Sequence, residues 1–272
     1  MTKSTASAPI EIGSVTLTVH DLAGMTAFYQ RLLGLEQMSG DGSETVLGAG
    51  GRVLLRLRGD RAARRASSRE AGLFHTAFLM PSRVALAEWL IHAANDRVQL
   101  QGASDHLVSE AIYLADPEGN GIEVYADRPR MAWYGADGKL KMATDALDLN
   151  GLAATARAPW GGAPAGLVVG HVHLQVGAVP AAEAFYSGVI GMDVTSHYPG
   201  AAFYGSGGYH HHLATNIWNS RNAQPRSLPA TGLAEVELLA DAAAHDGLLA
   251  RAGGDVAADP WGTPIRFTKK AA

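Results

Sequence analysis

The chain has 272 residues, of which 47% are hydrophobic, with a mean hydropathy of +0.00 and a net charge of −4. This composition indicates a globular protein with a buried core and no basic surface for nucleic acid or an anionic membrane. The sequence has no cysteine, which excludes disulfides, a thiolate metal site and a cysteine nucleophile. Neither a membrane helix nor the apolar core of a secretion signal is recognisable, so a cytoplasmic protein is expected.

The first expected unit is a strand, a helix and two closing strands. Residues 15–19 alternate between apolar and polar side chains, which predicts a strand. Asp21 can cap a helix over residues 22–33. Two further apolar runs, residues 44–47 and 52–57, are separated by glycines and are expected to be strands.

The second unit follows the same plan. Residues 74–79 are expected to form its first strand, and a helix is expected over residues 82–94. Its closing strands are predicted at residues 109–114 and 121–125, joined by an Asp-Pro-Glu-Gly turn.

The third and fourth units complete the repeat. The third begins at Gly170 and has late strands at residues 202–204 and 210–217. The fourth begins near Leu233 and is truncated. Self-similarity on this scale predicts a fold made of repeated small units. We therefore expect an α+β protein of four βαβββ modules, which form two barrel-like units of paired modules.

The modules are divided between two halves of the chain. Modules one and two occupy residues 8–128, and modules three and four occupy residues 167–270. Residues 129–166 between them are rich in Gly, Ala and Pro and are expected to be a linker, with a short helical patch at residues 145–156.

The aligned copies differ at chemically important positions. The segment that begins at Gly13 aligns without a gap to the segment that begins at Gly170. Three substitutions separate the copies: Ser14 stands opposite His171, Arg266 opposite Glu123, and Glu235 opposite His75. The potential metal ligands therefore belong to the second and third modules.

Two histidines and one carboxylate on adjacent strands would form the facial triad that binds non-haem Fe(II) and leaves positions open. The alternative for His75 is a core histidine whose nitrogens bond to the backbone. Glu123 favours a metal, because a carboxylate between Ile122 and Val124 is costly to bury without a partner. His173 competes with His171, because it lies on the same strand face. Only a pairing of modules two and three would unite the three ligands.

Two longer phrases carry a family resemblance. One is GASDHLVSEAIY at residues 102–113, which runs into DPEGNGIE at 116–123 and YADRPR at 125–130, and the other is GGYHHHL at 207–213. With the module pattern, they resemble the vicinal oxygen chelate superfamily, which includes glyoxalase I, bleomycin-binding and fosfomycin-resistance proteins and extradiol dioxygenases. The chain is most similar to bacterial catechol 2,3-dioxygenases of the four-module kind.

The resemblance implies an extradiol ring-cleaving dioxygenase that acts on catechol or a substituted catechol with O₂. The metal would be Fe(II), with Mn(II) as the alternative, held by His75, Glu123 and His171. Such an enzyme would have no nucleic-acid or membrane partner, and we expect a homo-oligomer.

The resemblance also implies catalytic residues. His211 is the best positional match to the family's acid/base histidine. On a strand it would face away from His210 and His212, and the role would pass to His212 or His210 if the face is misassigned. Tyr113 matches a tyrosine that bonds the substrate, and His106 is a further candidate that Asp105 could orient. The alternatives are a polar strand edge, a cross-strand aromatic and a solvated loop histidine.

Two other functions remain compatible with the sequence. A glyoxalase-like, metal-dependent lyase or isomerase would use no O₂ and would require Glu235 to approach the metal. A non-catalytic protein that binds an aromatic antibiotic would need no metal, in keeping with the ligands lost at Ser14 and Arg266.

Overall fold

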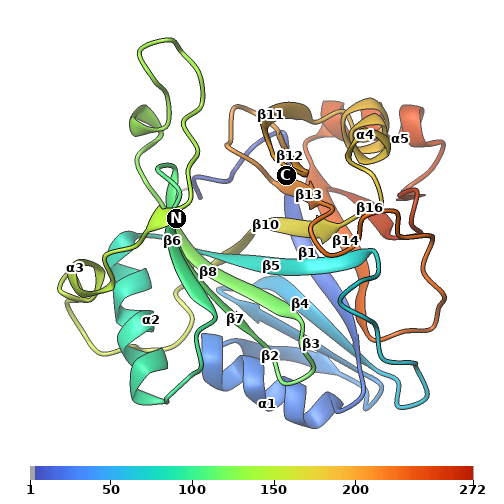
Figure 1. Ribbon diagram of the computed structural model, residues 1–272. Helices are drawn as coiled ribbons and strands as arrows, with labels where there is room; N and C mark the ends of the chain where they lie inside the picture. The colour runs from blue at the N-terminus through green and yellow to red at the C-terminus, as the bar shows by residue number, and fades with distance from the viewer. Residues whose placement is uncertain (1–3, 272) are drawn as a thin grey trace.

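The computed structural model describes residues 4–271. Residues 1–3 lie outside the described residues. They belong to the N-terminal segment in which no secretion signal was expected. Strands in two curled sheets and a small number of helices give an α+β architecture (Figure 1), as the sequence predicted. Within residues 4–271, no helix is long and apolar enough to cross a membrane.

The N-terminal half contains the elements of the first two modules. They are β1 (Ile10–Val19), α1 (Leu22–Leu33), β2 (Glu36–Gly40), β3 (Glu44–Ala49), β4 (Arg52–Gly59), β5 (Gly72–Met80), α2 (Arg83–Asn95), β6 (Gly102–Asp105), β7 (Ser109–Ala115) and β8 (Gly121–Asp127). The α1 helix begins after Asp21, whose side chain accepts a hydrogen bond from the Gly24 backbone, and ends at Gly34 in the left-handed conformation.

The rest of the chain begins with the short elements η1 (Arg130–Ala132), β9 (Asp145–Ala146) and α3 (Leu149–Ala153). The third and fourth modules follow. They contain β10 (Val168–Gln175), α4 (Val179–Glu183), the π-helical turn η2 (Ala184–Val189), β11 (Asp193–Tyr198), β12 (Ala201–Gly205), β13 (Leu213–Asn216), β14 (Gly232–Ala240), α5 (Ala242–Ala252), β15 (Val256–Ala258) and β16 (Pro264–Lys269).

Each sheet takes one module from each half of the chain. The seven-stranded sheet has the order β15-β16-β14-β1-β4-β3-β2 and joins modules one and four. The nine-stranded sheet has the order β11-β12-β13-β10-β5-β8-β7-β6-β9 and joins modules two and three. Antiparallel pairs, β1 with β14 and β5 with β10, form the two junctions. Strands β10, β5 and β8 are consequently neighbours, although they are distant in sequence.

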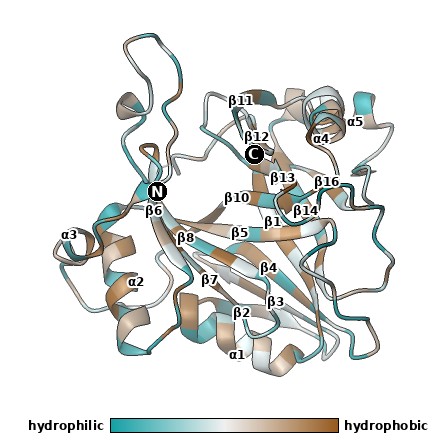
Figure 2. Cartoon of the chain, viewed as in Figure 1, coloured by the Kyte–Doolittle hydropathy of each residue, from teal (hydrophilic) through white to brown (hydrophobic). Residues whose placement is uncertain are grey.

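The core runs through both sheets, which contact each other through β1 and β10. Hydrophobic residues are concentrated on the strands and on the helices that cover them, whereas the long connecting loops are more hydrophilic (Figure 2). Trp89 on α2 is fully buried and donates its indole N–H to the Leu32 carbonyl at the end of α1, which joins the helices of two modules.

The repeated Ala-Phe-Tyr and Asp-Pro motifs bond to each other. The Tyr29 hydroxyl on α1 donates to Asp116 at 2.9 Å, and the Tyr186 hydroxyl donates to Asp259 at 2.9 Å. Asp116 also accepts the backbone N–H of Asn120 in its turn. Burial raises the pKa of both tyrosines, so their hydroxyls remain donors. Each pair fastens the helix of one module to the closing turn of the next, and thereby one sheet to the other.

Removal of the hydrogen bond between Tyr29 and Asp116 should destabilise the fold. Tyr29→Phe leaves the ring in place but deprives a buried carboxylate of a donor, at a cost of about 1–3 kcal/mol in unfolding free energy. Tyr186→Phe should lose a similar amount. Tyr134→Phe, which alters an exposed tyrosine, is the control. Urea denaturation measures the three effects, and a Tyr29→Phe protein as stable as the control would contradict this interpretation.

Two local predictions were wrong. Residues 145–156 are not one helical patch, because β9 adds to the edge of the nine-stranded sheet beside β6 before α3 packs on α2. The three consecutive histidines precede β13, so they are not in a strand. The His210 carbonyl accepts from the Thr195 hydroxyl at 2.6 Å, outside any strand ladder.

Candidate metal centre

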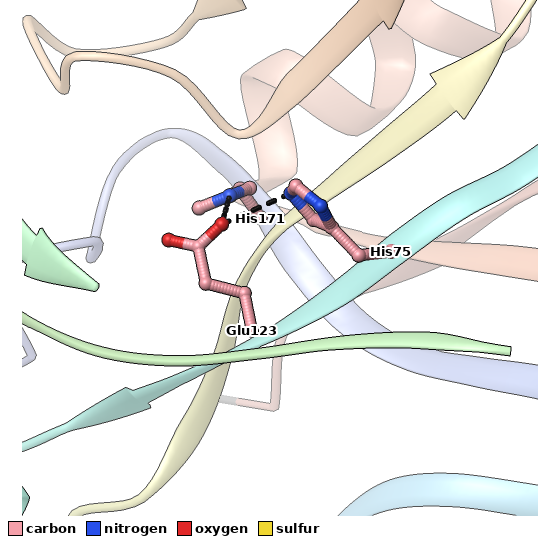
Figure 3. A group of neighbouring side chains, drawn as sticks. All are labelled: His75, Glu123 and His171. Carbon is pink, nitrogen blue, oxygen red and sulfur yellow. Dashed lines mark hydrogen bonds and ion pairs between the residues drawn. The ribbon is translucent and has the colours of Figure 1, made fainter. Parts of the chain in front are cut away.

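Three adjacent strands bring the predicted ligands together. His75 lies on β5, Glu123 on β8 and His171 on β10, and β5 is the middle strand of the three. Ala77 pairs with both Glu123 and His171 across the neighbouring strands. His75 lies two residues before Ala77 on β5, so the side chains of His75, Glu123 and His171 are on the same face of the sheet. They converge on one point (Figure 3).

The cluster is compact and buried. The Nε2 atom of His75 lies 3.0 Å from Oε2 of Glu123, and Nε2 of His171 lies 3.2 Å from the same oxygen. The candidate ligand atoms all lie within 4.8 Å of one another. Each residue is at most 6% exposed. These donors fit a divalent metal that binds two imidazoles and a carboxylate.

One buried atom adds support to this fit. His75 Nε2 makes no hydrogen bond, although it lies 3.0 Å from Oε2 of Glu123. Buried polar nitrogens are seldom left without a partner, and an ion is one of the few explanations. A core histidine bonded to the backbone, the alternative for His75, would not leave this atom without one.

The protonation states also suit metal binding. Burial lowers the pKa of His171, although the Glu123 carboxylate opposes this effect, so its imidazole is neutral at pH 7. Burial alone would raise the pKa of Glu123, but the neighbouring His171 and His75 hold that pKa well below its usual value. A neutral imidazole and an ionised carboxylate are the forms that coordinate metals.

The cluster opens on a cavity of about 400 Å³. Its walls are largely apolar and aromatic, with Phe74, Phe203 and Trp218 among the lining residues. Met142 also lines it, so the segment expected to be only a linker contributes to the wall. No local pattern indicated this contribution, because it depends on long-range packing of residues 129–166.

Tyr113 lies beside the cluster. It pairs with Glu123 across the antiparallel strands β7 and β8, and both side chains line the cavity. Its hydroxyl lies 2.6 Å from Nε2 of His106. Burial, reinforced by the Glu123 charge, raises the pKa of Tyr113 well above 10, so the phenol keeps its proton.

His106 lies in the tight turn between β6 and β7 and also lines the cavity. The expectation that Asp105 orients it was wrong. The Asp105 carboxylate pairs with Arg128 at 2.6 Å, whereas Nδ1 of His106 lies 2.6 Å from the Ala143 carbonyl. A carbonyl can accept only from N–H, so Nδ1 carries the proton and Nε2 accepts from the Tyr113 hydroxyl.

His211 faces the cavity and packs against His171, with ring centroids 4.2 Å apart. Burial lowers its pKa well below 6.5, so it is a neutral base at pH 7. His212 is turned away from the cavity and bonds to the Ala6 carbonyl at 2.7 Å. His212 therefore cannot replace His211 at the cavity, which the sequence alone had allowed.

Other sequence candidates lie outside the cluster. His173 is close to His75 but bonds Asn216 at 3.0 Å, and it is not among the convergent ligand atoms. Glu235 forms an ion pair with Arg266 at 2.8 Å in the seven-stranded sheet. The glyoxalase-like alternative required Glu235 to approach the metal, and this position contradicts that requirement.

Comparison with known proteins defines the family. The sequence profile of the Glyoxalase/Bleomycin resistance protein/Dioxygenase superfamily matches residues 11–124 and 168–263. The chain belongs to this superfamily. It is 38% identical over 252 residues to a catechol-2,3-dioxygenase of Bacillus subtilis (strain 168), over 87% of this chain and 88% of the relative.

Solved structures share the fold. A putative dioxygenase from Bacillus subtilis subsp. subtilis str. 168 superposes with a TM-score of 0.68 at 12% identity, over all of this chain and 87% of the other. Glyoxalase I from Zea mays gives a TM-score of 0.56 at 14% identity, over 96% of this chain and 92% of the other. At such identities the likeness concerns the fold alone.

Proposed function

We propose that this protein is an extradiol dioxygenase, which opens the ring of catechol or a substituted catechol with O₂. The observation that carries the proposal is a buried cluster of two histidines and one carboxylate beside a cavity of about 400 Å³. The 38% identity to a catechol-2,3-dioxygenase supports the same activity.

His75, Glu123 and His171 would hold the metal, which is Fe(II) in this proposal, with Mn(II) as the alternative. When bound, this ion supplies Lewis acidity to the diol and an open position for O₂. The protein contributes a sheltered site, because all three ligands are buried and the cavity walls are largely apolar.

The remaining polar residues handle protons. His211 is neutral and faces the cavity, so it can take a proton from a catechol hydroxyl and return it later. Tyr113 keeps its phenolic proton and donates a hydrogen bond through it to Nε2 of His106 in the resting site. When a substrate oxygen approaches, the same O–H can be redirected to it.

The cavity wall favours uncharged ring substituents. Among the described residues that line it, none is a lysine or arginine, and Glu123 is the only carboxylate. A ring carboxylate that points away from the metal would enter without a lysine or arginine partner, which is costly in an apolar site. Methyl or halogen substituents would instead contact Phe74, Trp218 and Met142.

This gives a prediction for substrate preference. Catechol and 4-methylcatechol should consume O₂ and form the yellow ring-fission product. The kcat/KM for 3,4-dihydroxybenzoate should be about 10–100-fold lower than that for catechol. This factor corresponds to the cost of about 1–3 kcal/mol for burying a polar group without a partner. O₂ consumption by the Fe(II)-loaded protein measures all three. Equal kcat/KM values would contradict the interpretation of the wall, and turnover of none of them would contradict the proposed function.

A further inference from the structure

A chain of three polar side chains leads from the protein interior to the cavity. Asp127, at the end of β8, lies 2.8 Å from Nε2 of His210, and these side chains are 2% and 0% exposed. The opposite nitrogen of that ring, Nδ1, lies 2.8 Å from Nδ1 of His211. His211 lines the cavity, and its Nδ1 is directed away from it toward His210.

The surroundings of His210 hold the ring in place. Tyr209 and Trp133 pack against it, with ring centroids 4.1 and 4.9 Å away, and both are almost fully buried. The second carboxylate oxygen of Asp127 accepts from the Thr5 hydroxyl. Neither Asp127 nor His210 lines the cavity, so neither would touch a substrate.

With His210 in its neutral form, the two distances determine where the protons lie. An ionised carboxylate only accepts, so Nε2 of His210 must carry a proton and donate it to Asp127. In a neutral His210, Nδ1 then has no proton and must accept the hydrogen bond from Nδ1 of His211. His211 thus carries its proton on Nδ1. Its Nε2, the nitrogen left for the cavity, keeps a free lone pair.

We propose that Asp127 and His210 are positioning residues that fix the tautomer of His211, so that Nε2 is a proton acceptor in the cavity. This proposal rests on the proposed function in one respect only, which is that the dioxygenase reaction gives the Nε2 lone pair of His211 a catalytic role. A neutral imidazole without such partners favours the proton on Nε2, and that tautomer could donate to the catechol but could not accept from it. Orientation of a basic nitrogen through its opposite N–H is how buried carboxylates support other catalytic histidines.

The sequence did not reveal this arrangement. Asp127 begins an Asp-Arg-Pro-Arg run and is typical of a solvated ion pair there. Its burial depends on contacts with Thr5 and His210, which are distant in sequence and which local sequence patterns do not predict.

The direct test is the protonation of the His211 nitrogens. We would record ¹⁵N spectra of histidine-labelled protein loaded with diamagnetic Zn(II), assigned with a His211→Phe variant. The expected result is a protonated Nδ1 and an unprotonated Nε2. The double variant Asp127→Asn/His210→Phe removes the chain without leaving a buried unpaired charge, and it should move the proton to Nε2. Protonated Nε2 in the wild type, or no change in the double variant, would overturn the proposal.

Kinetics provide the second readout. With catechol, Asp127→Asn should lower kcat by at least about 10-fold, toward the 10²–10⁴-fold scale of a lost acid/base group, with KM within about 3-fold and metal content unchanged. Thr5→Val, which removes the hydrogen bond from Thr5 to Asp127 and leaves the contact with His210 in place, should retain wild-type kcat. An Asp127→Asn protein with wild-type kcat would also overturn the proposal. If the wild type does not turn over catechol, the proposed function fails, whereas the ¹⁵N spectra still decide the tautomer.

Discussion

Glu123→Gln is expected to reduce the affinity for Fe(II) by more than about 100-fold. Loss of a residue that only supports a ligand already costs about 10–100-fold in affinity, and Glu123 is the only carboxylate among the convergent donors. The variant also leaves two buried imidazoles without the charge that lies 3.0 and 3.2 Å from them. Metal analysis after anaerobic purification, together with Fe(II) titration, would measure the loss, and ring-cleaving activity should fall with it.

A matched control is available in the other sheet. Glu237 is a carboxylate in the module pair that lacks the ligands, where it accepts hydrogen bonds from Ser14 and Thr268 at 2.8 Å. Glu237→Gln should bind metal as the wild type does. Retention of full metal content by Glu123→Gln, or equal loss in both variants, would be incompatible with the proposed centre.

His211→Phe is expected to lower kcat by about 10²–10⁴-fold while the metal remains bound. The ring volume is retained, so the contact with His171 is preserved, but the proton acceptor is lost. Since the metal and the aromatic walls still bind catechol, KM should change much less than kcat. Because burial lowers the pKa of His211, wild-type kcat/KM should stay level as the pH falls from neutral through the usual histidine range.

The neighbouring histidine is the control for this prediction. His212 is fully buried and bonds Ala6, so His212→Gln should reduce stability and leave kcat nearly unchanged. If His211→Phe loses its metal, His211 is a ligand. If His211→Phe keeps wild-type kcat while His212→Gln does not, the proton carrier has been misassigned.

The fold was predictable from sequence where the signals are local. Asp21 and Gly34 delimit α1 at the residues expected, because capping and left-handed termination depend on single positions. The repeated motifs predicted the modules and, by comparison of copies, the three residues that converge. The pairing of module two with module three could be inferred only from the positions of those three ligands. Strand alternation does not specify which modules share a sheet.

The rest of the site depends on contacts between distant segments. The linker supplies Met142 to the cavity and the Ala143 carbonyl to His106, although its composition is typical of a loop. The histidine run was expected to belong to the strand predicted over residues 210–217. In the structure the strand begins only at Leu213. His210 forms hydrogen bonds with the side chains of Thr195 and Asp127 and, within residues 4–271, has no strand partner there.

The most direct test of the dioxygenase proposal is the fate of oxygen. The Fe(II)-loaded protein would be mixed with catechol under ¹⁸O₂, and the product would be analysed by mass spectrometry at early times. Extradiol cleavage adds both atoms of O₂ to the ring-opened product, so we predict two labelled oxygens, one O₂ consumed per catechol, and loss of both signals in Glu123→Gln. A product without label, or catechol recovered unchanged from protein that contains its metal, would contradict the proposed function.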